Sequence, residues 1–464
     1  MPGLNGLLGM GANALATFQR ALAVTGQNLS NVNTPGYSRQ EIVLAEGIPE
    51  DAIPGQLGTG VVATQIRRSI DTFVEAQLLT SRERLGQFSA SQNALTQIQT
   101  VFADSNDQGI AASLNDFFQA WQDVATNPAD LTSRTVLLSK ADVVAKRLNQ
   151  AATQLSAHRN SLDGQILRGI ADINTLAGQI ADLNGKIKLA EVSGQQANDL
   201  RDQRGRYLND LAELVDISTL EESDGQVSVF VGVGQVLVTQ QTAFRLAGVA
   251  DITNSGLSDV QYDNGSGANT DLTGVISGGR LKGWIDARDT TAASLQSSLD
   301  TLASQLVSQV NTQHRAGYGL DGSTTQDFFT ATGTTAATIG VALTDRRQVA
   351  ASSTAAGVPG NNVNALAVAG LQDSTLAGLG NATFQEYYSA LAGSFGATLQ
   401  GTKRDLEGQE ILNDQLLAHR AQVSGVSMDE ELISLLKYQR AFEAASKLIT
   451  TSDEMLQTIL TLKR

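Results

Sequence analysis

The sequence contains no cysteine, and this absence excludes several kinds of site at once. Without cysteine the chain has no disulfide, no thiolate nucleophile, no cysteine-based zinc site and no iron–sulfur cluster. The three histidines, His158, His314 and His419, lie far apart in the sequence, and the H-E-x-x-H motif does not occur. We therefore predict no metal, no cofactor and no catalytic residue, and a protein that is not an enzyme.

Basic residues and long apolar runs are also scarce. The 464 residues include 32 Lys and Arg against 47 Asp and Glu, which gives a formal net charge of −15. Such a chain has no large cationic field, so neither nucleic acid nor an anionic membrane is expected as a partner. No apolar run is long enough to span a bilayer, and Met1–Val24 lacks a basic leader, so we expect a soluble chain without a classical signal peptide. Aromatic residues make up only 5%, which favours slim helical packing over one broad core.

Apolar residues repeat at seven-residue spacing at both ends of the chain. The N-terminal row consists of Leu8, Leu15, Leu22 and Leu29 with Phe18 on an interleaved position, and the C-terminal row of Met428, Leu432, Leu435, Phe442, Ile449, Leu456 and Leu460. A stripe with this spacing must face another helix. We expect the two ends to pair as a coiled coil. Since isolated helices are marginal in water, we also expect them to pack on neighbouring copies of the chain.

The interior combines further helices with a β segment. Apolar residues at alternating steps of three and four predict a long helix over 162–190, and similar rows predict helices over 74–102, 295–310 and 404–423. Between Ile217 and Val238, valines alternate with small or polar residues, which is the period of a half-buried strand. The predicted fold is mainly α with inserted β. It is an elongated multi-domain rod with paired terminal helices, a helical-bundle shaft and a small distal β domain.

These patterns predict three domains. They are a discontinuous terminal coiled-coil domain of residues 1–45 and 420–464, a helical shaft of residues 46–216 and 281–419 with a small β or loop element near 318–360, and an inserted β domain of residues 217–280.

A sharp turn is predicted directly after the N-terminal heptads. The motif consists of Asn31, Asn33, Thr34, Pro35, Gly36, Tyr37, Ser38 and Arg39. Thr34 is pushed toward extended geometry because it precedes proline, and Pro35-Gly36 suits the central positions of a type II turn. The segment stops a helix and offers no nucleophile with a base.

The C-terminal helix has a start signal of its own. Ser427 with Glu430 three residues later predicts a capping box, and acidic residues at 429–431 suit the positive end of a helix. A carboxylate metal cluster is the alternative interpretation, but the helix dipole already explains these charges.

Together the two ends resemble the flagellar axial proteins, in particular the family of the first hook-associated protein, FlgK. The turn motif at 31–39 is similar to the N-terminal signature of that family, and the segments 423–442 and 446–455 are similar to its C-terminal signature. Two interior segments, Asn198–Arg204 and Val310–His314, also resemble family segments.

The resemblance implies a secreted, self-assembling structural protein of the bacterial flagellum at the hook–filament junction. It implies export in an unfolded state from the cytoplasm through the flagellar type III system. The implied partners are copies of itself, the hook protein, the second hook-associated protein and an export chaperone that holds the C-terminal segment. The alternatives are another axial subunit of hook or rod type, a cytosolic coiled-coil scaffold, or a secreted enzyme or adhesin whose β insertion carries the activity.

Overall fold

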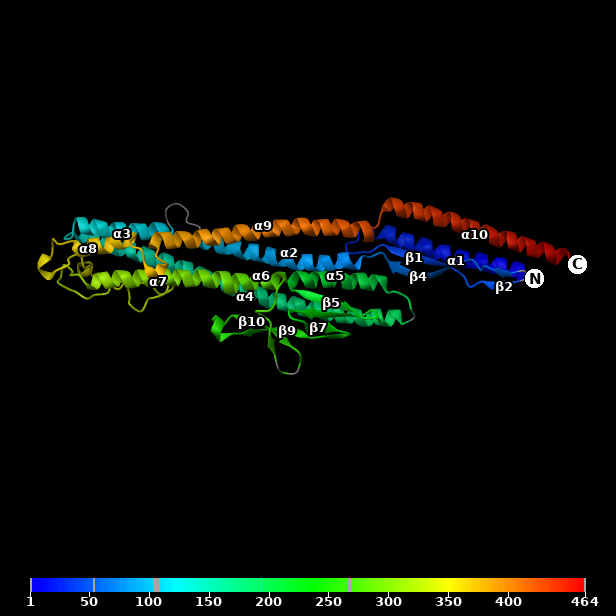
Figure 1. Ribbon diagram of the computed structural model, residues 1–464, viewed down its shortest axis with the longest axis horizontal. Helices are drawn as coiled ribbons and strands as arrows, with labels where there is room; N and C mark the ends of the chain where they lie inside the picture. The colour runs from blue at the N-terminus through cyan, green and yellow to red at the C-terminus, as the bar shows by residue number, and fades with distance from the viewer. Residues whose placement is uncertain are drawn as a thin grey trace.

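The computed structural model describes residues 2–52, 55–102, 109–192, 194–265, 267 and 269–462. The molecule is a long rod, and both chain termini lie at the same end of it (Figure 1). The helices are α1 (Pro2–Ser30), α2 (Thr72–Gln99), α3 (Ile110–Thr126), α4 (Leu131–Glu191), α5 (Asn198–Leu214), α6 (Gly279–Ile285), α7 (Ala292–Arg315), α8 (Val363–Ala369), α9 (Phe384–Ser424) and α10 (Met428–Leu462). This confirms the mainly helical, elongated fold with an inserted β region. Within the described residues, no helix combines the length and apolar character that crossing a membrane requires.

The strands form small antiparallel sheets. They are β1 (Gln40–Glu46), β2 (Glu50–Ala52), β3 (Gly55–Leu57), β4 (Val61–Arg68), β5 (Ile217–Glu221), β6 (Val227–Val231), β7 (Gln235–Thr239), β8 (Thr242–Ala243), β9 (Arg245–Ala250), β10 (Ser258–Asp263) and β11 (Thr270–Asp271). Strand β1 pairs with β4, β2 with β3, and the inserted region has a sheet of order β5-β6-β7-β8 and another of order β11-β10-β9.

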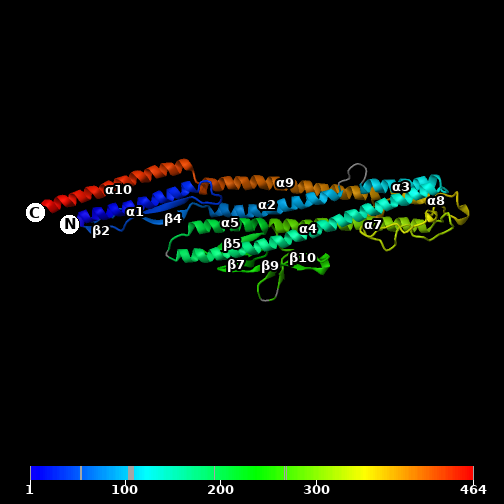
Figure 2. The same ribbon diagram turned by 180° about the vertical axis from the view of Figure 1, so that it is seen from behind.

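The first and last helices pack against each other as an antiparallel pair. Figure 2 shows α1 and α10 side by side at the terminal end, and their contact is the most extensive between any two elements of the described chain. The helices approach closely at Gly11, where an added Cβ would lie 2.6 Å from Cγ1 of Ile449. Glycine is therefore required at this position by the distance between the helices, and the predicted pairing of the chain ends is observed.

A β-hairpin that the sequence patterns did not predict lies along α1. Strand β1 pairs with β4 from Gln40↔Arg68 to Glu46↔Val61, with an irregularity between Val43 and Leu44. Most of its residues are half-buried or exposed, so no clear period-two alternation marks it in the sequence. The expected boundary at residue 45 therefore falls inside a strand, and the helical part of the shaft begins only at Thr72.

The shaft is built around α4, which is longer than expected. It runs for 61 residues, or about 90 Å at about 1.5 Å per residue. The predicted helix covers only its second half. The first half was missed although it buries Leu137, Val144, Leu148 and Leu155 at helical spacing, with Ala141, Ala145 and Ala152 between them. These alanines are buried, so small residues continue the packing face there.

The inserted β region lies on the flank of the shaft, and its expected distal position is wrong (Figure 1). Its buried residues Val229, Leu237 and Val260 share one core with the α4 row that begins at Ile166 and includes Ile180. That row lies on the half of α4 nearer to the chain termini, so the sheets are held there. The distal end is formed by α3, α8 and the loops that follow α7 (Figure 1).

Buried polar side chains organise the distal loops. Asn311 accepts hydrogen bonds from Phe328 N and Phe329 N at 2.9 and 2.8 Å and donates one to Phe329 O at 2.8 Å. His314 is completely buried, with Nδ1 2.7 Å from Gln326 O, and its Nε2 accepts from Ala350 N at 2.9 Å. This acceptor role requires a neutral ring that carries its proton on Nδ1. The interior segment 310–314 thus anchors the loops of the distal end.

We expect His314 to make stability depend on pH. Burial lowers its pKa from 6.5 to about 4, although the hydrogen bond to Gln326 raises it. The native state therefore keeps the ring neutral where the unfolded state protonates it. The contribution of His314 to the free energy of unfolding is complete above pH 6.5 and is lost as the pH falls toward 4. At pH 5 the loss amounts to about 2 kcal/mol.

The measurement is the unfolding free energy of the wild type and of His314→Gln at pH 7.5 and pH 5. The difference between the two proteins should shrink by about 2 kcal/mol at the lower pH. Comparison with the variant is necessary because Glu83, whose pKa burial raises to about 7, has the opposite pH dependence in this range. His158→Gln is the control. A difference that does not change with pH contradicts the prediction.

Candidate functional site

The predicted turn is present at the end of α1. Tyr37 N donates to Thr34 O at 3.2 Å, and Gly36 has φ +75°, which a type II turn requires at its third position. Asn31 closes the helix, since its Nδ2 donates to Gln27 O at 3.0 Å and its Oδ1 accepts from Thr34 Oγ1 at 3.0 Å. Pro35 and Asn33 are exposed on the outside of the turn.

The turn is fastened back onto α1 by Asn28. The Asn28 side chain is buried and pairs with both backbone groups of Gln40, each at 2.9 Å. Its Oδ1 also accepts from the Tyr37 hydroxyl at 2.8 Å. Burial raises the pKa of Tyr37 above its ordinary value, and the nearby carboxylates of Asp199, Asp202 and Glu431 add to the shift. The phenol therefore stays protonated and remains a hydrogen-bond donor.

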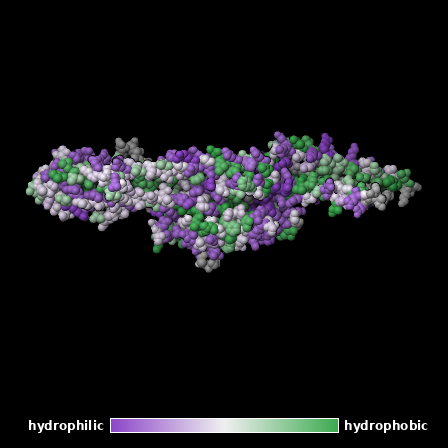
Figure 3. All heavy atoms as spheres, in the orientation of Figure 1, coloured by the Kyte–Doolittle hydropathy of each residue, from purple (hydrophilic) through white to green (hydrophobic). Residues whose placement is uncertain are grey.

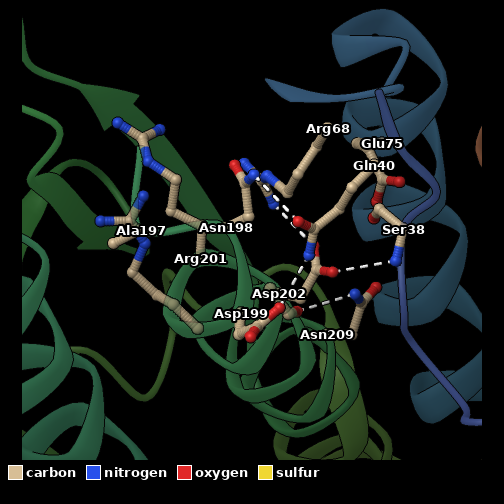
Figure 4. Close-up of polar contacts among 12 residues, drawn as sticks. Ser38, Gln40, Arg68, Glu75, Ala197, Asn198, Asp199, Arg201, Asp202 and Asn209 are labelled. Atoms are coloured by element: carbon tan, nitrogen blue, oxygen red, sulfur yellow. Dashed lines mark hydrogen bonds and ion pairs between the residues drawn. The ribbon is translucent and has the colours of Figure 1, made fainter. Parts of the chain in front are cut away.

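The second half of the motif binds α5 of the shaft. Ser38 N donates to Asp202 Oδ2 at 2.9 Å, and Arg68 of β4 donates to Asp202 Oδ1 at 2.9 Å (Figure 4). Gln40 Nε2 donates to Asp199 Oδ1 at 2.8 Å from the same turn of α5. The carboxylate of Asp202 is nearly inaccessible and thus joins the turn, the hairpin and the shaft at one point.

Arg39 connects the motif to the other end of the chain. Its backbone N donates to Ser424 O at 2.9 Å, and its Nε lies 2.7 Å from Oε1 of Glu431 in α10. The Glu431 side chain is 2% exposed, so the ion pair is largely shielded from water on that side. Glu430 also lies 3.6 Å from Arg39.

These contacts modify the expected start of α10. Ser427 Oγ accepts from Glu430 N at 3.5 Å, so the first half of the predicted capping box is present but long. The Glu430 side chain is directed to Arg39. Since Glu430 and Glu431 both face a guanidinium, the acidic cluster serves an ion-pair network.

The predicted coiled-coil residues fall into two groups. Leu435, Phe442, Ile449 and Leu456 are half-buried on the α10 face toward α1, with small or polar residues such as Ala445 and Ser452 buried between them. In α1 the most buried positions include Gly11, Thr17, Ala21 and Val24, while Leu8, Leu15, Phe18, Leu22 and Leu29 are half-buried. Met428, Leu432 and Leu460 are 52%, 45% and 64% exposed, so within one chain they lie outside the seam, and their role in contacts with neighbouring copies stays a prediction.

The exposed residues at the start of α10 form an apolar patch. We call Met428, Leu432, Ile433 and Leu436 the α10 patch; Ile433 is 67% and Leu436 59% exposed. Figure 3 shows apolar residues gathered over the end of the molecule that α1 and α10 form. The buried positions of α10 include Glu431, Ala445 and Ser452, while these large apolar side chains stay on its exposed flank.

Replacing Asp202 with alanine is expected to open the junction between the turn and the shaft. The change leaves Ser38 N and the Arg68 guanidinium without their acceptor, at a cost of about 2–3 kcal/mol. Amide exchange at 31–40 should accelerate by about 30- to 150-fold. Asp199→Ala is the matched control, because Asp199 lies on the same helix turn but is exposed. Equal acceleration of amide exchange in the two variants would show that the burial of Asp202 does not strengthen the junction.

Several members of this site were not identified as site residues from the sequence. Asp202 belongs to the family-like segment 198–204, but nothing in that segment indicates that it contacts the turn. Asn28 and Arg68 carry no local signal, and Glu431 was attributed to the helix dipole. The only available indication was that the segments 31–39 and 198–204 both resemble parts of one family.

Comparison with known proteins places these segments in a wider context. The model of the flagellar hook-associated protein FlgK helical domain matches residues 95–329. The models of the flagellar basal body rod FlgEFG protein C-terminal region and of the flagella basal body rod protein match 420–462 and 8–37.

Two relatives match nearly the whole chain. Flagellar hook-associated protein 1 of Bacillus subtilis is 27% identical, over 96% of this chain and 96% of the relative. The protein of the same name from Salmonella typhimurium is 23% identical, over 99% of this chain and all of the relative. The solved structure of the flagellar hook junction protein FlgK from Burkholderia pseudomallei is similar with a TM-score of 0.67 at 18% identity, over 75% of this chain and all of that chain, which shows a shared fold.

Proposed function

The chain belongs to the FlgK family of flagellar hook-associated proteins, structural components of the flagellar axis, and from this we propose that it is the self-assembling adaptor between hook and filament. Its partners would be copies of itself, the hook protein and the second hook-associated protein, in the extracellular flagellum. The relatives named hook-associated protein 1 support this placement, and they match the chain over nearly its full length.

The observation that carries the proposal is the α10 patch beside the paired termini. Its four residues are each at least 45% exposed, and burying a side chain of this size is worth about 1.5–3 kcal/mol. An apolar patch of this kind on a soluble chain marks an interaction surface. Contact with neighbouring subunits would cover it, and the network around Arg39 and Asp202 would set the direction in which the terminal pair leaves the shaft.

Export in an unfolded state fits the same features. The chain carries no cysteine and only 6 prolines, so neither disulfides nor many slow prolyl isomerisations would delay folding after export. The C-terminal segment exposes apolar residues before assembly, and a chaperone in the cytoplasm would cover them.

A hook or rod subunit is the second candidate, because the two ends of the chain match rod-protein models. The FlgK helical-domain match favours the junction role, since it covers residues 95–329, whereas the rod-protein models match only 8–37 and 420–462.

Deletion of the gene separates these candidates. A junction protein predicts cells that keep complete hooks, carry no filaments and release filament subunits into the medium, with filaments restored by the gene on a plasmid. Loss of the hooks themselves would indicate a rod or hook subunit. Normal filaments would refute a structural role at either place.

A further inference from the structure

A groove of about 680 Å³ lies beside the junction, between α2, α5 and the turn motif. Its apolar lining includes Ile70, Leu79 and Leu208, and Pro35 and Gly36 form part of its edge. Strand β5 contributes Thr219 and Glu221 on the side of the inserted β region. The groove is therefore partly apolar and borders all three parts of the chain.

The charged residues of this groove are unusual for so acidic a protein. Six arginines and four carboxylates line it, whereas the whole chain has a net charge of −15. Arg68 and Arg420 are paired with Asp202 and Glu75. Within the described residues, the side chains of Arg82 and Arg206 form no hydrogen bond or ion pair, although the charges of both act on the nearby carboxyl of Asp210. The Arg206 side chain lies against the turn, where a Cβ on Gly36 would be 2.7 Å from its Cγ. Two guanidinium groups thus share one carboxylate, and the surplus positive charge can attract an acidic ligand.

The same chain carries a segment with complementary properties. Residues 46–51 contain Glu46, Glu50 and Asp51 and no basic residue. Ile48 is 88% exposed and Leu57, on the opposite strand, is 57% exposed. Strands β2 and β3 pair with each other, and neither has extensive contact with another element of the described chain. An acidic hairpin with exposed apolar side chains therefore projects from the terminal unit without a partner.

The hairpin cannot reach the groove of its own chain. The chain next to the hairpin lies near Met10 of α1, since a Cβ on Gly60 would be 2.8 Å from Met10 Cγ. The groove begins beyond the other end of α1, after residue 30. Twenty residues of helix separate these points by about 30 Å. A second copy that lies alongside, displaced by about this distance along the rod, brings its hairpin to the groove. Such a contact joins two different surfaces, and repetition of it generates a ring or a helical array.

We propose that the groove between α2 and α5 binds the acidic segment 46–52 of a neighbouring copy of this chain, together with its paired strand β3. Glu50 and Asp51 face Arg82 and Arg206, and Ile48 enters the apolar part of the groove. The proposal rests on self-assembly as stated under the proposed function, and it names the pair of surfaces that would join adjacent copies.

The absence of cysteine allows a direct test by cross-linking of introduced thiols with a bismaleimide. A flexible linker is needed because an ion pair of two long side chains holds their Cα atoms farther apart than the about 7 Å that a disulfide can bridge. Flagella are isolated from cells that produce the full chain with Glu50→Cys and Arg206→Cys, treated with the bismaleimide, and analysed by denaturing electrophoresis. The expected result is a ladder of multiples of the chain mass, absent from either single variant. The pair Glu50→Cys with Ser139→Cys, on the exposed distal face of α4, is the control and should give no ladder. No ladder, or cross-links only to a different protein, would overturn the proposal.

Charge reversal provides a second test that does not depend on cross-linking. Glu50→Lys is expected to lower the fraction of hooks that carry the protein at least tenfold, and Arg206→Glu in the same chain should restore it. No loss in the single variant, or no rescue in the double variant, contradicts the pairing. Immunogold labelling of the wild type separates the failure of this contact from the failure of the junction role. If the protein lies at the hook tip but no ladder forms, only the contact is refuted. If the protein is absent from the hook tip, both the junction role and the contact are refuted.

Discussion

Replacing Leu436 with glutamate is expected to abolish filament attachment while the isolated chain remains folded. Leu436 is 59% exposed in the single chain, so the substitution should change the free energy of unfolding by no more than about 0.5 kcal/mol. In the assembled state the same position would be buried against a neighbouring subunit. An unpaired carboxylate there costs several kcal/mol, which is enough to reduce assembly by a factor of about 100 or more.

The readouts are swimming, filament counts by electron microscopy and thermal unfolding of the purified chain. Thr451→Glu is the matched control, because it adds the same charge at an exposed, polar position farther along α10. We expect it to leave the filaments in place. Normal motility with Leu436→Glu would show that the α10 patch is not an assembly surface. A lowered melting temperature would instead show that the patch stabilises the monomer.

Replacing Asn311 with alanine is expected to destabilise the distal end of the shaft by about 4 kcal/mol. The Asn311 amide satisfies three backbone groups, the N–H of Phe328 and both the N–H and the carbonyl of Phe329. Each buried group left without a partner costs about 1–3 kcal/mol, and relaxation of the loop recovers part of that sum. The segment that follows α7 should then lose its protection from hydrogen exchange.

Asn311→Leu distinguishes hydrogen bonding from packing, because leucine has the same branched shape and number of heavy atoms as asparagine, fills the site with its larger methyl groups and cannot donate or accept. It should destabilise the distal end about as much as the alanine variant does. Asn149→Ala is the control, since Asn149 is only half-buried and bonds to two carbonyls of the same loops. If Asn311→Leu proves as stable as the wild type, the three hydrogen bonds contribute nothing to stability. The destabilisation by Asn311→Ala would then come from the cavity that the smaller side chain leaves.

Most helices were predictable because their determinants are local. The alternating apolar steps over 166–187 identify the second half of α4, and the Pro35-Gly36 dipeptide identifies a turn that the backbone confirms. The resemblance of both ends to one family was also carried by short motifs, and the relatives that match nearly the whole chain confirm the family. The first half of α4 was missed although Leu137, Val144 and Leu148 are buried there at helical spacing.

The sequence by itself determined the helices at both ends, α2, α7 and the second halves of α4 and α9, whereas α3, α5 and α8 were not predicted. It also determined that both ends carry apolar faces and to which family the chain belongs. Only the tertiary structure decided which faces meet. Asp202 receives the Ser38 N–H across 164 residues of chain, Gly11 lets α1 approach α10 closely at Ile449, and Met428 and Leu432 lie outside the seam. Periodicity shows that a face must be covered, but not whether its own chain or another subunit covers it. That choice depends on distances between helices, which side chains far apart in the sequence set together.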